Sequence, residues 1–201
     1  MGEVKQIKMR DAYGEALVRL GEQHEEVVAL TGDVCNSDRS IFFEKAYPER
    51  FFNVGIAEPS LVDTAVGFAY SGHVPFVNTF AVFLATRALE MVRTHVCYGR
   101  ANVKLMGAYA GLSDSFDGPT HHSVTDVAIM RSLPYMSVLV PGDPNEMDAV
   151  LEAVYRWDEP VYCRLNRNEV PVIFDEGLAP AVKQGRPPAF EIGKARVLRE
   201  G

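Results

Sequence analysis

Short apolar runs alternate with stretches of helical periodicity along most of the chain, and this alternation limits the fold more than any other feature. The apolar runs have the length and the branched or aromatic side chains of buried β-strands. They are expected at residues 27–31, 51–54, 74–78, 103–108, 136–140 and 161–165. Strands separated by helices pair in parallel through right-handed crossovers. We therefore predict a doubly wound α/β fold, a mostly parallel six-stranded sheet with helices on both faces.

The helices are predicted from apolar residues that recur every three or four positions. They are expected at residues 9–22, 40–47, 58–71, 80–98, 124–133 and 143–157. The fourth is predicted to be the longest and continuous. Asp143 followed by Glu146 indicates a capping box at the start of the last helix, and Ser123 followed by Asp126 predicts a similar cap for the helix before it.

The alternation fades after the last predicted strand, and proline and glycine become frequent. We expect residues 1–168 to form one α/β domain and residues 169–201 to form an extended linker. The stretch from Glu191 onward has the character of a strand, so the linker is predicted to lead into a further, missing C-terminal domain.

Composition excludes several classes of protein. The chain has 20 Lys plus Arg against 27 Asp plus Glu, a net charge of −7, which argues against nucleic acid as a partner. No apolar run approaches the ~18 residues that span a bilayer, and the start of the sequence lacks a signal peptide. We expect a cytoplasmic protein with no membrane partner. Three distant cysteines, and two histidines without a third ligand at a recognisable spacing, indicate neither a disulfide framework nor a metal site.

Ligands of doubly wound sheets bind beyond the carboxyl ends of the strands, so residues after each strand are candidates for function. Glu58 is the single carboxylate in the nearly apolar run from Phe51 to Pro59. A carboxyl group there is partly desolvated, which favours the protonated form that a general acid needs. The structural alternative is that Glu58 complements the dipole at the start of the next helix.

Two further segments follow strands. Phe80 and Phe83 share a helix face and can line a slot for a flat ring, although the same spacing fits core packing. In the one long polar loop, a Gly-Pro turn can present Asp117 and His121 together, a carboxylate and an imidazole able to orient hydroxyl groups and move protons. A solvated turn before a helix explains that loop equally well. No phosphate-binding glycine loop or dinucleotide motif occurs.

These segments resemble the pyrimidine-binding domain of the thiamine-diphosphate-dependent transketolase family. The matching pieces are Phe52-Asn-Val-Gly-Ile-Ala-Glu58, Thr79-Phe-Ala-Val-Phe83 and Asp117-Gly-Pro-Thr-His121, in the family's order and at similar separations. The resemblance covers about residues 9–167 and implies the thiamine-diphosphate-binding fold.

The resemblance implies roles for individual residues. Glu58 would hydrogen-bond a ring nitrogen of the aminopyrimidine and favour the imino tautomer, which takes the proton from the thiazolium carbon. Phe80 and Phe83 would pack against the pyrimidine ring. Asp117 and His121 would contact the hydroxyl and carbonyl oxygens of a ketose, with Glu58 and His121 as the catalytic residues.

Other positions match the family's substrate site in part. Arg10, Ser37 and Arg167 fall where transketolases hold the sugar phosphate, and Asp33 falls at a carboxylate that lines the active site. Tyr109 departs from the pattern, since a phosphate-site histidine is common there. The residues directly before Asp117, Asp-Ser-Phe, also replace the usual Val-Gly-Glu.

The family's diphosphate-binding module, which holds magnesium through Gly-Asp-Gly and a downstream asparagine, has no counterpart in this sequence. The resemblance therefore implies the second-half subunit of a split transketolase, which contacts the pyrimidine half of thiamine diphosphate. A separate diphosphate-binding subunit would carry Mg²⁺, and the assembly would be a homodimer or heterotetramer. The implied reaction moves a two-carbon ketol unit between sugar phosphates.

Three alternatives remain at this point. Deoxyxylulose-phosphate synthase and the β subunit of a 2-oxoacid dehydrogenase belong to the same family, and the segment from Asp117 to His121 favours the sugar enzymes over the latter. A non-catalytic assembly or regulatory module of the same fold is the third. Glu58 argues against it, because an unpaired carboxyl group in an apolar pocket lowers stability without a ligand. The donor and acceptor sugars and the partner chain are left open.

Overall fold

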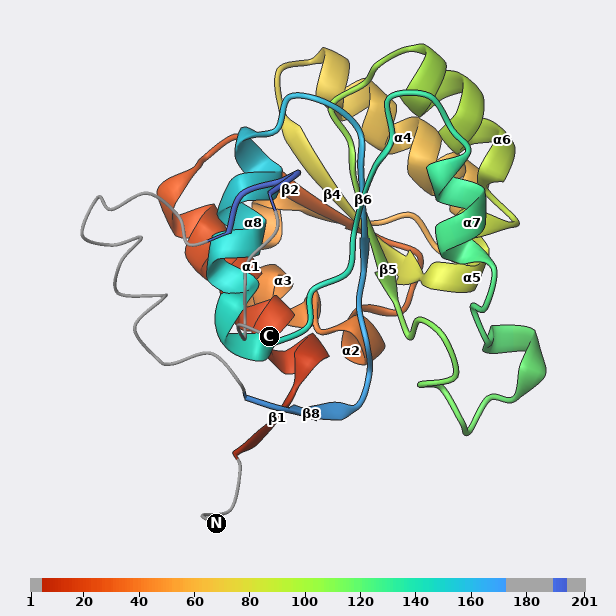
Figure 1. Ribbon diagram of the computed structural model, residues 1–201. Helices are drawn as coiled ribbons and strands as arrows, with labels where there is room; N and C mark the ends of the chain where they lie inside the picture. The colour runs from red at the N-terminus through yellow and green to blue at the C-terminus, as the bar shows by residue number, and fades with distance from the viewer. Residues whose placement is uncertain (1–4, 173–189, 195–201) are drawn as a thin grey trace.

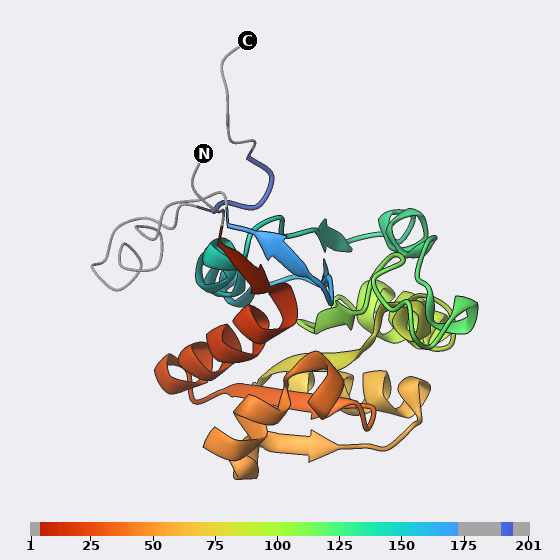
Figure 2. The same ribbon diagram turned by 90° about the horizontal axis from the view of Figure 1, so that it is seen from below.

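The computed structural model describes residues 5–172 and 190–194. A six-stranded sheet has the order β3-β2-β4-β5-β7-β6, and all its neighbouring strands are parallel. The strands are β2 (Val27–Thr31), β3 (Phe51–Asn53), β4 (Val74–Phe80), β5 (Lys104–Ala108), β6 (Ser137–Leu139) and β7 (Val161–Arg164). Figure 2 shows them stacked in this order. The predicted doubly wound α/β fold is confirmed.

Helices cover both faces of this sheet. One face carries α1 (Met9–Gln23), α3 (Ile41–Ala46) and α8 (Met147–Arg156). The other carries α4 (Glu58–Tyr70), α5 (Ala81–Ala85), α6 (Leu89–Met91), the π-helix η2 (Val92–Tyr98) and α7 (Asp126–Arg131). Figure 1 shows the first layer to the left of the sheet and the second to the right. Short helical turns complete the chain: α2 (Cys35–Asp38), η1 (Pro48–Arg50), η3 (Pro119–His121) and η4 (Pro144–Glu146).

Each layer encloses its own core. In β2, Val27 and Ala29 belong to the core beneath α1 and α8, whereas Val28 and Leu30 belong to the core beneath α4 and α5. Successive strand residues point to opposite faces, so a strand covered on both faces is apolar throughout. The chain leaves β2 toward β3 and then crosses back to β4, and the crevice for a ligand lies at such a reversal, beyond the carboxyl ends of the strands.

The prediction of one continuous helix over residues 80–98 was wrong. The hydroxyl of Thr86 donates to the carbonyl of Val82 at 2.6 Å, and the N–H of Ala88 bonds the carbonyl of Phe83, five residues back, at 3.0 Å. A β-branched residue that binds the preceding turn bends a helix, and a five-residue bond widens it. The segment is therefore divided into α5, a turn, α6 and the π-helix.

One of the two predicted caps is present. Asp143 and Glu146 form the capping box that begins η4, which leads into α8. Ser123 does not cap α7, because its backbone pairs with Gly111 through bonds of 2.9 and 3.0 Å and closes the polar loop. The helix begins after Thr125 with no side-chain cap.

A small antiparallel sheet, unpredicted, joins β1 (Gln6–Lys8) to β8 (Glu169–Pro171). The domain boundary after residue 168 stays a prediction. The linker over residues 173–189 and most of the strand expected from Glu191 lie outside the described residues, and residues 192–193 lie in a turn. Within the described ranges, no helix combines the length and apolar character needed to cross a membrane.

Candidate functional site

An aromatic cluster lies at the carboxyl ends of β4 and β5. Phe80 ends β4 and Tyr109 follows β5, and their rings stack with centroids 4.7 Å apart and 17° between planes. The ring centroid of Phe83, in the first turn of α5, lies 5.8 Å from that of Phe80. The imidazole of His121 meets both phenylalanines edge-on, at 5.7 and 5.3 Å. The structure thus brings Phe80, Phe83 and His121 to one place.

Tyr109 connects this cluster to the basic residues. The φ angle of Tyr109 is 58°, in the left-handed region. Non-glycine residues rarely adopt this conformation, and those that do are frequent at functional sites. The Tyr109 hydroxyl accepts a hydrogen bond of 2.6 Å from Nη1 of Arg10, which also donates to the Ser37 carbonyl at 3.1 Å. The guanidinium carbon of Arg167 lies 4.9 Å from the tyrosine ring centroid. Arg10, Ser37 and Arg167 are therefore close together, with Ser37 contributing its carbonyl to this contact.

Glu58 is the first residue of α4, and its side chain is 2% exposed. Its Oε2 accepts a hydrogen bond of 2.9 Å from Nη1 of Arg87. The guanidinium carbon of Arg87 lies 4.1 Å from the ring centroid of Phe83, so one arginine joins the buried carboxyl group to the aromatic cluster. This counter-ion is not indicated by the apolar run around Glu58. The position at the start of α4 also agrees with the dipole explanation.

Arg87 is a residue that sequence reasoning missed. It lies in the turn between α5 and α6, and its side chain is 47% exposed. A continuous helix would have placed it on a regular helix face, whereas the break at Thr86 places it beside both Phe83 and Glu58. The usable signal was that Arg87 is the one charged residue between Phe80 and Leu89.

The polar loop contributes a second buried carboxyl group, Asp114, also missed. Arg167 Nη1 donates to its Oδ1 at 3.3 Å, and its side chain is 1% exposed. Burial raises the pKa of Asp114 and the Asp117 carboxylate adds to this rise, while Arg167 and His121 oppose it. Asp117 itself is exposed. The sequence signal for Asp114 was that an aspartate stands where the family pattern usually has an apolar residue.

The turn after Asp117 depends on glycine. Gly118 has φ 79° and ψ −166°, a conformation that is essentially closed to residues with a side chain. The His121 N–H bonds the carbonyl of Gly118 at 3.0 Å, which begins the short helix η3. The Gly-Pro turn therefore fixes the direction in which His121 leaves the loop.

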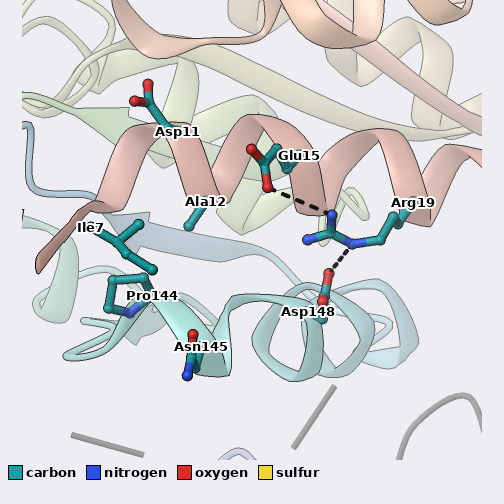
Figure 3. A pocket seen from close by; sticks show the side chains of 8 residues that line it. All are labelled: Ile7, Asp11, Ala12, Glu15, Arg19, Pro144, Asn145 and Asp148. Carbon is teal, nitrogen blue, oxygen red and sulfur yellow. Dashed lines mark hydrogen bonds and ion pairs between the residues drawn. The ribbon is translucent and has the colours of Figure 1, made fainter. Parts of the chain in front are cut away.

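Asp33 is placed differently from the other predicted site residues. It is exposed, and its Oδ1 accepts a hydrogen bond of 2.9 Å from Asn53 at the end of β3, rather than joining the aromatic cluster. A cavity of ≈ 280 Å³ lies elsewhere, between α1 and the start of α8, where Arg19 bonds Asp148 at 2.8 Å (Figure 3). No predicted site residue lines it; its lining residues are Ile7, Asp11, Ala12, Glu15, Arg19, Pro144, Asn145 and Asp148.

Comparison with known proteins identifies the family. Residues 5–172 match the family described as Transketolase, pyrimidine binding domain. A protein of Methanocaldococcus jannaschii named as a transketolase C-terminal section is 36% identical over 193 residues, which are 96% of this chain and 58% of that protein. The 6-deoxy-6-sulfo-D-fructose transketolase subunit of a Clostridium species is 34% identical over 194 residues, 96% of this chain and 57% of that subunit.

A solved structure titled as a split-gene transketolase, an inactive β4 tetramer, aligns with a TM-score of 0.83 and 41% identity. The alignment covers 97% of this chain and 59% of that one, so the chain spans somewhat more than half the length of each of these three proteins. The family match covers most of the chain and includes every residue of the aromatic cluster. The chain belongs to the transketolase family, as its pyrimidine-binding domain.

Proposed function

We propose that the chain is the pyrimidine-binding subunit of a thiamine-diphosphate-dependent transketolase, which transfers a two-carbon ketol unit between sugar phosphates. The observation that carries this proposal is the buried carboxyl group of Glu58, joined through Arg87 to the rings of Phe83 and Phe80 at the carboxyl edge of the sheet. Relatives named as a C-terminal section and as a subunit support a split enzyme. A separate diphosphate-binding subunit would supply Mg²⁺ and complete a homodimeric or heterotetrameric assembly.

The residues fit the pyrimidine half of the cofactor. Phe80 and Phe83 offer apolar ring surface, and the Glu58 carboxyl group can share a proton with a ring nitrogen. Arg87 holds that carboxyl group through Oε2, and because the arginine side chain is half-exposed it can move aside and leave a carboxyl oxygen to a ligand. When bound, thiamine diphosphate supplies the nucleophilic carbon that ketol transfer needs.

The substrate side would be formed by the loop and the basic residues. His121 packs against both phenylalanines, so it would face a ketose carbonyl beside the bound ring, with Asp117 contacting the hydroxyl groups. Beyond Tyr109, the guanidinium groups of Arg10 and Arg167 would hold the phosphate together with Ser37. Asp33 would line the outer part of the site.

The decisive test is Glu58→Gln in the complex reconstituted with the diphosphate-binding subunit, thiamine diphosphate and Mg²⁺. We expect turnover to fall by at least about 100-fold, since a positioned proton-transfer group contributes about 10²–10⁴-fold. Ketol transfer is measured by product analysis with paired ketose and aldose phosphates.

Glu90→Gln is the matched control, because Glu90 is an exposed acid that also pairs with an arginine, Arg93, at 2.8 Å. It should leave turnover unchanged. Wild-type turnover in Glu58→Gln would overturn the catalytic role and favour an assembly module instead.

A further inference from the structure

Two guanidinium groups converge on Tyr109, and each has an acidic neighbour only at a long distance. The guanidinium carbons of Arg10 and Arg167 lie 5.8 and 4.9 Å from its ring centroid. The Nε of Arg10 is buried with no hydrogen-bond partner among the described residues. Its acidic neighbour Asp11 lies 4.0 Å away and bonds Arg39 at 2.6 Å instead. A buried, unused donor beside a second cation indicates a site for an oxyanion.

Arg167 is held on the other side by Asp114. The Nη1 to Oδ1 distance of 3.3 Å is long for a charged pair, and the second carboxyl oxygen, Oδ2, is buried with no partner among the described residues. The guanidinium group of Arg167 also lies 5.0 Å from the ring centroid of Phe116. Arg167 and Asp114 are thus joined by one weak hydrogen bond, and only one of the two carboxyl oxygens of Asp114 has a hydrogen-bond partner among the described residues.

Within residues 5–172 and 190–194, the titratable or charged groups beside Asp114 are Asp117, Arg167, His121 and His122. The carboxylate of Asp117 raises the pKa of Asp114, and Arg167 and His121 lower it. The imidazole Nε2 of His122 lies 2.9 Å from the backbone carbonyl oxygen of Asp114. Burial disfavours the charged form of Asp114, and the bonded guanidinium group of Arg167 opposes the resulting rise in its pKa.

We propose that an oxyanion bound between Arg10 and Arg167 draws Arg167 away from Asp114, and that Asp114 then takes up one proton, which it shares with Asp117. This inference rests on the proposed function, in which a substrate phosphate is that oxyanion. The proton comes from solvent and forms an O–H bond on Oδ2 of Asp114, which donates to a carboxylate oxygen of Asp117. No other bond forms or breaks.

The exchange links the two ends of a substrate. Asp117 is the proposed contact of the substrate hydroxyl groups, and a proton shared with Asp114 would fix the position of its carboxylate. Asp114 is then a positioning residue, since it touches no reacting atom. Substrates with a charged end would order Asp117, and substrates without one would not.

Sulfate is the probe for this exchange, because it does not itself titrate near neutral pH. The full chain is titrated with sulfate by calorimetry in two buffers of different ionisation enthalpy, between about pH 5 and pH 8. We expect net proton uptake that approaches one proton per sulfate. The affinity should fall as pH rises, by up to about tenfold per pH unit above the Asp114 titration.

Asp114→Asn assigns the proton. Without the competing carboxylate, sulfate affinity should rise by roughly tenfold at the upper end of the range. Most of the proton uptake should disappear. Asp148→Asn is the matched control, since Asp148 is a partly buried acid that bonds an arginine, Arg19, at 2.8 Å and lies away from this loop. It should behave as the wild type.

Three outcomes overturn the proposal: no sulfate binding, sulfate binding without proton uptake, or uptake that is unchanged in Asp114→Asn. The first two are read on the wild-type chain, so they do not depend on the folding of a variant. Ketol transfer without sulfate-linked uptake would refute this inference alone. Uptake without ketol transfer would refute the proposed function and leave the oxyanion site in place.

Discussion

Two buried acids at the carboxyl edge of the sheet, Asp126 and Glu58, bond an arginine at the same distance but in different ways. Asp126 accepts from Arg164 at 2.9 Å and from the buried Tyr162 hydroxyl at 2.7 Å. Glu58 accepts from Arg87 at 2.9 Å. The side chain of Arg164 is 26% exposed, whereas that of Arg87 is 47% exposed and lies in a helix break.

The difference is in what holds the cation. Arg164 extends from β7 and is bonded within a network that also ties α7 to the sheet. Arg87 is in a turn and can exchange its partner with solvent or with a ligand. A buried acid–arginine pair therefore does not by itself indicate a functional site. The mobility of the arginine distinguishes the two cases. A fixed arginine indicates a structural ion pair, and an arginine that can move away leaves the carboxyl group able to bind a ligand.

Alanine substitution should separate the two acids by stability. Asp126→Ala leaves the buried Tyr162 hydroxyl and the Arg164 guanidinium group without their partner, so we expect a loss of about 3–4 kcal/mol in the free energy of unfolding. Glu58→Ala should lose only about 1 kcal/mol, because the freed Arg87 can turn to water. Urea denaturation followed by circular dichroism measures both. Equal losses would contradict the distinction.

Asp38 extends the comparison to a buried acid with no arginine bond. Its Oδ1 accepts from the Ser40 N–H at 2.8 Å, and its Oδ2 has no partner among the described residues. Burial raises its pKa from 3.8 to about 6. The folded state therefore holds this proton more tightly than the unfolded state, and the stability it contributes is lost as pH rises from about 4 through 6.

Asp38→Asn should remove that pH dependence. The unfolding free energy of the variant minus that of the wild type should increase by about 2–3 kcal/mol as pH rises from about 4 to 7. Denaturant unfolding at both pH values is the measurement. Asp158→Asn, a change at an exposed acid, should stay within about 0.5 kcal/mol of the wild type throughout. A constant difference between Asp38→Asn and the wild type over this range would show that folding does not raise the pKa of Asp38, and would contradict the prediction.

Most of the regular elements of the fold were predictable because each is determined by residues that are close together in the sequence. A strand covered on both faces must be apolar at every position, as β2 is, and the capping box at Asp143 is complete within four residues. The small sheet of β1 and β8 was not predictable, since its two three-residue strands are distant in sequence and half of their residues are polar. The break at Thr86 depends on one hydroxyl bond within a stretch of good helical period.

The candidate site divides in the same way. Glu58, Phe80, Phe83 and His121 could be singled out because they follow strands and lie in segments that resemble a family. Arg87 and Asp114 could not, since their importance arises from partners 29 and 53 residues away in the chain. Sequence pattern shows which elements end at the crevice. It does not show which charges meet there.

The smallest expected effect concerns Arg87. Arg87→Met should lower the unfolding free energy by less than about 1 kcal/mol, because a half-exposed ion pair contributes little. In the reconstituted enzyme, turnover should fall about tenfold with little change in KM for the ketose, since the Glu58 carboxyl group loses the contact that positions it. Arg87→Lys, which keeps a cation on a shorter reach, should recover part of this loss.

Arg164→Met is the comparison that decides how the Arg87 result is interpreted. It removes the cation from the saturated network around Asp126, so it should destabilise the fold more than Arg87→Met does. If the two substitutions lower stability equally and neither shows the loss of turnover, Arg87 is a second structural tie. The buried carboxyl group of Glu58 would then be explained by its place at the start of α4, because a carboxylate there is stabilised by the helix dipole whether or not a ligand binds.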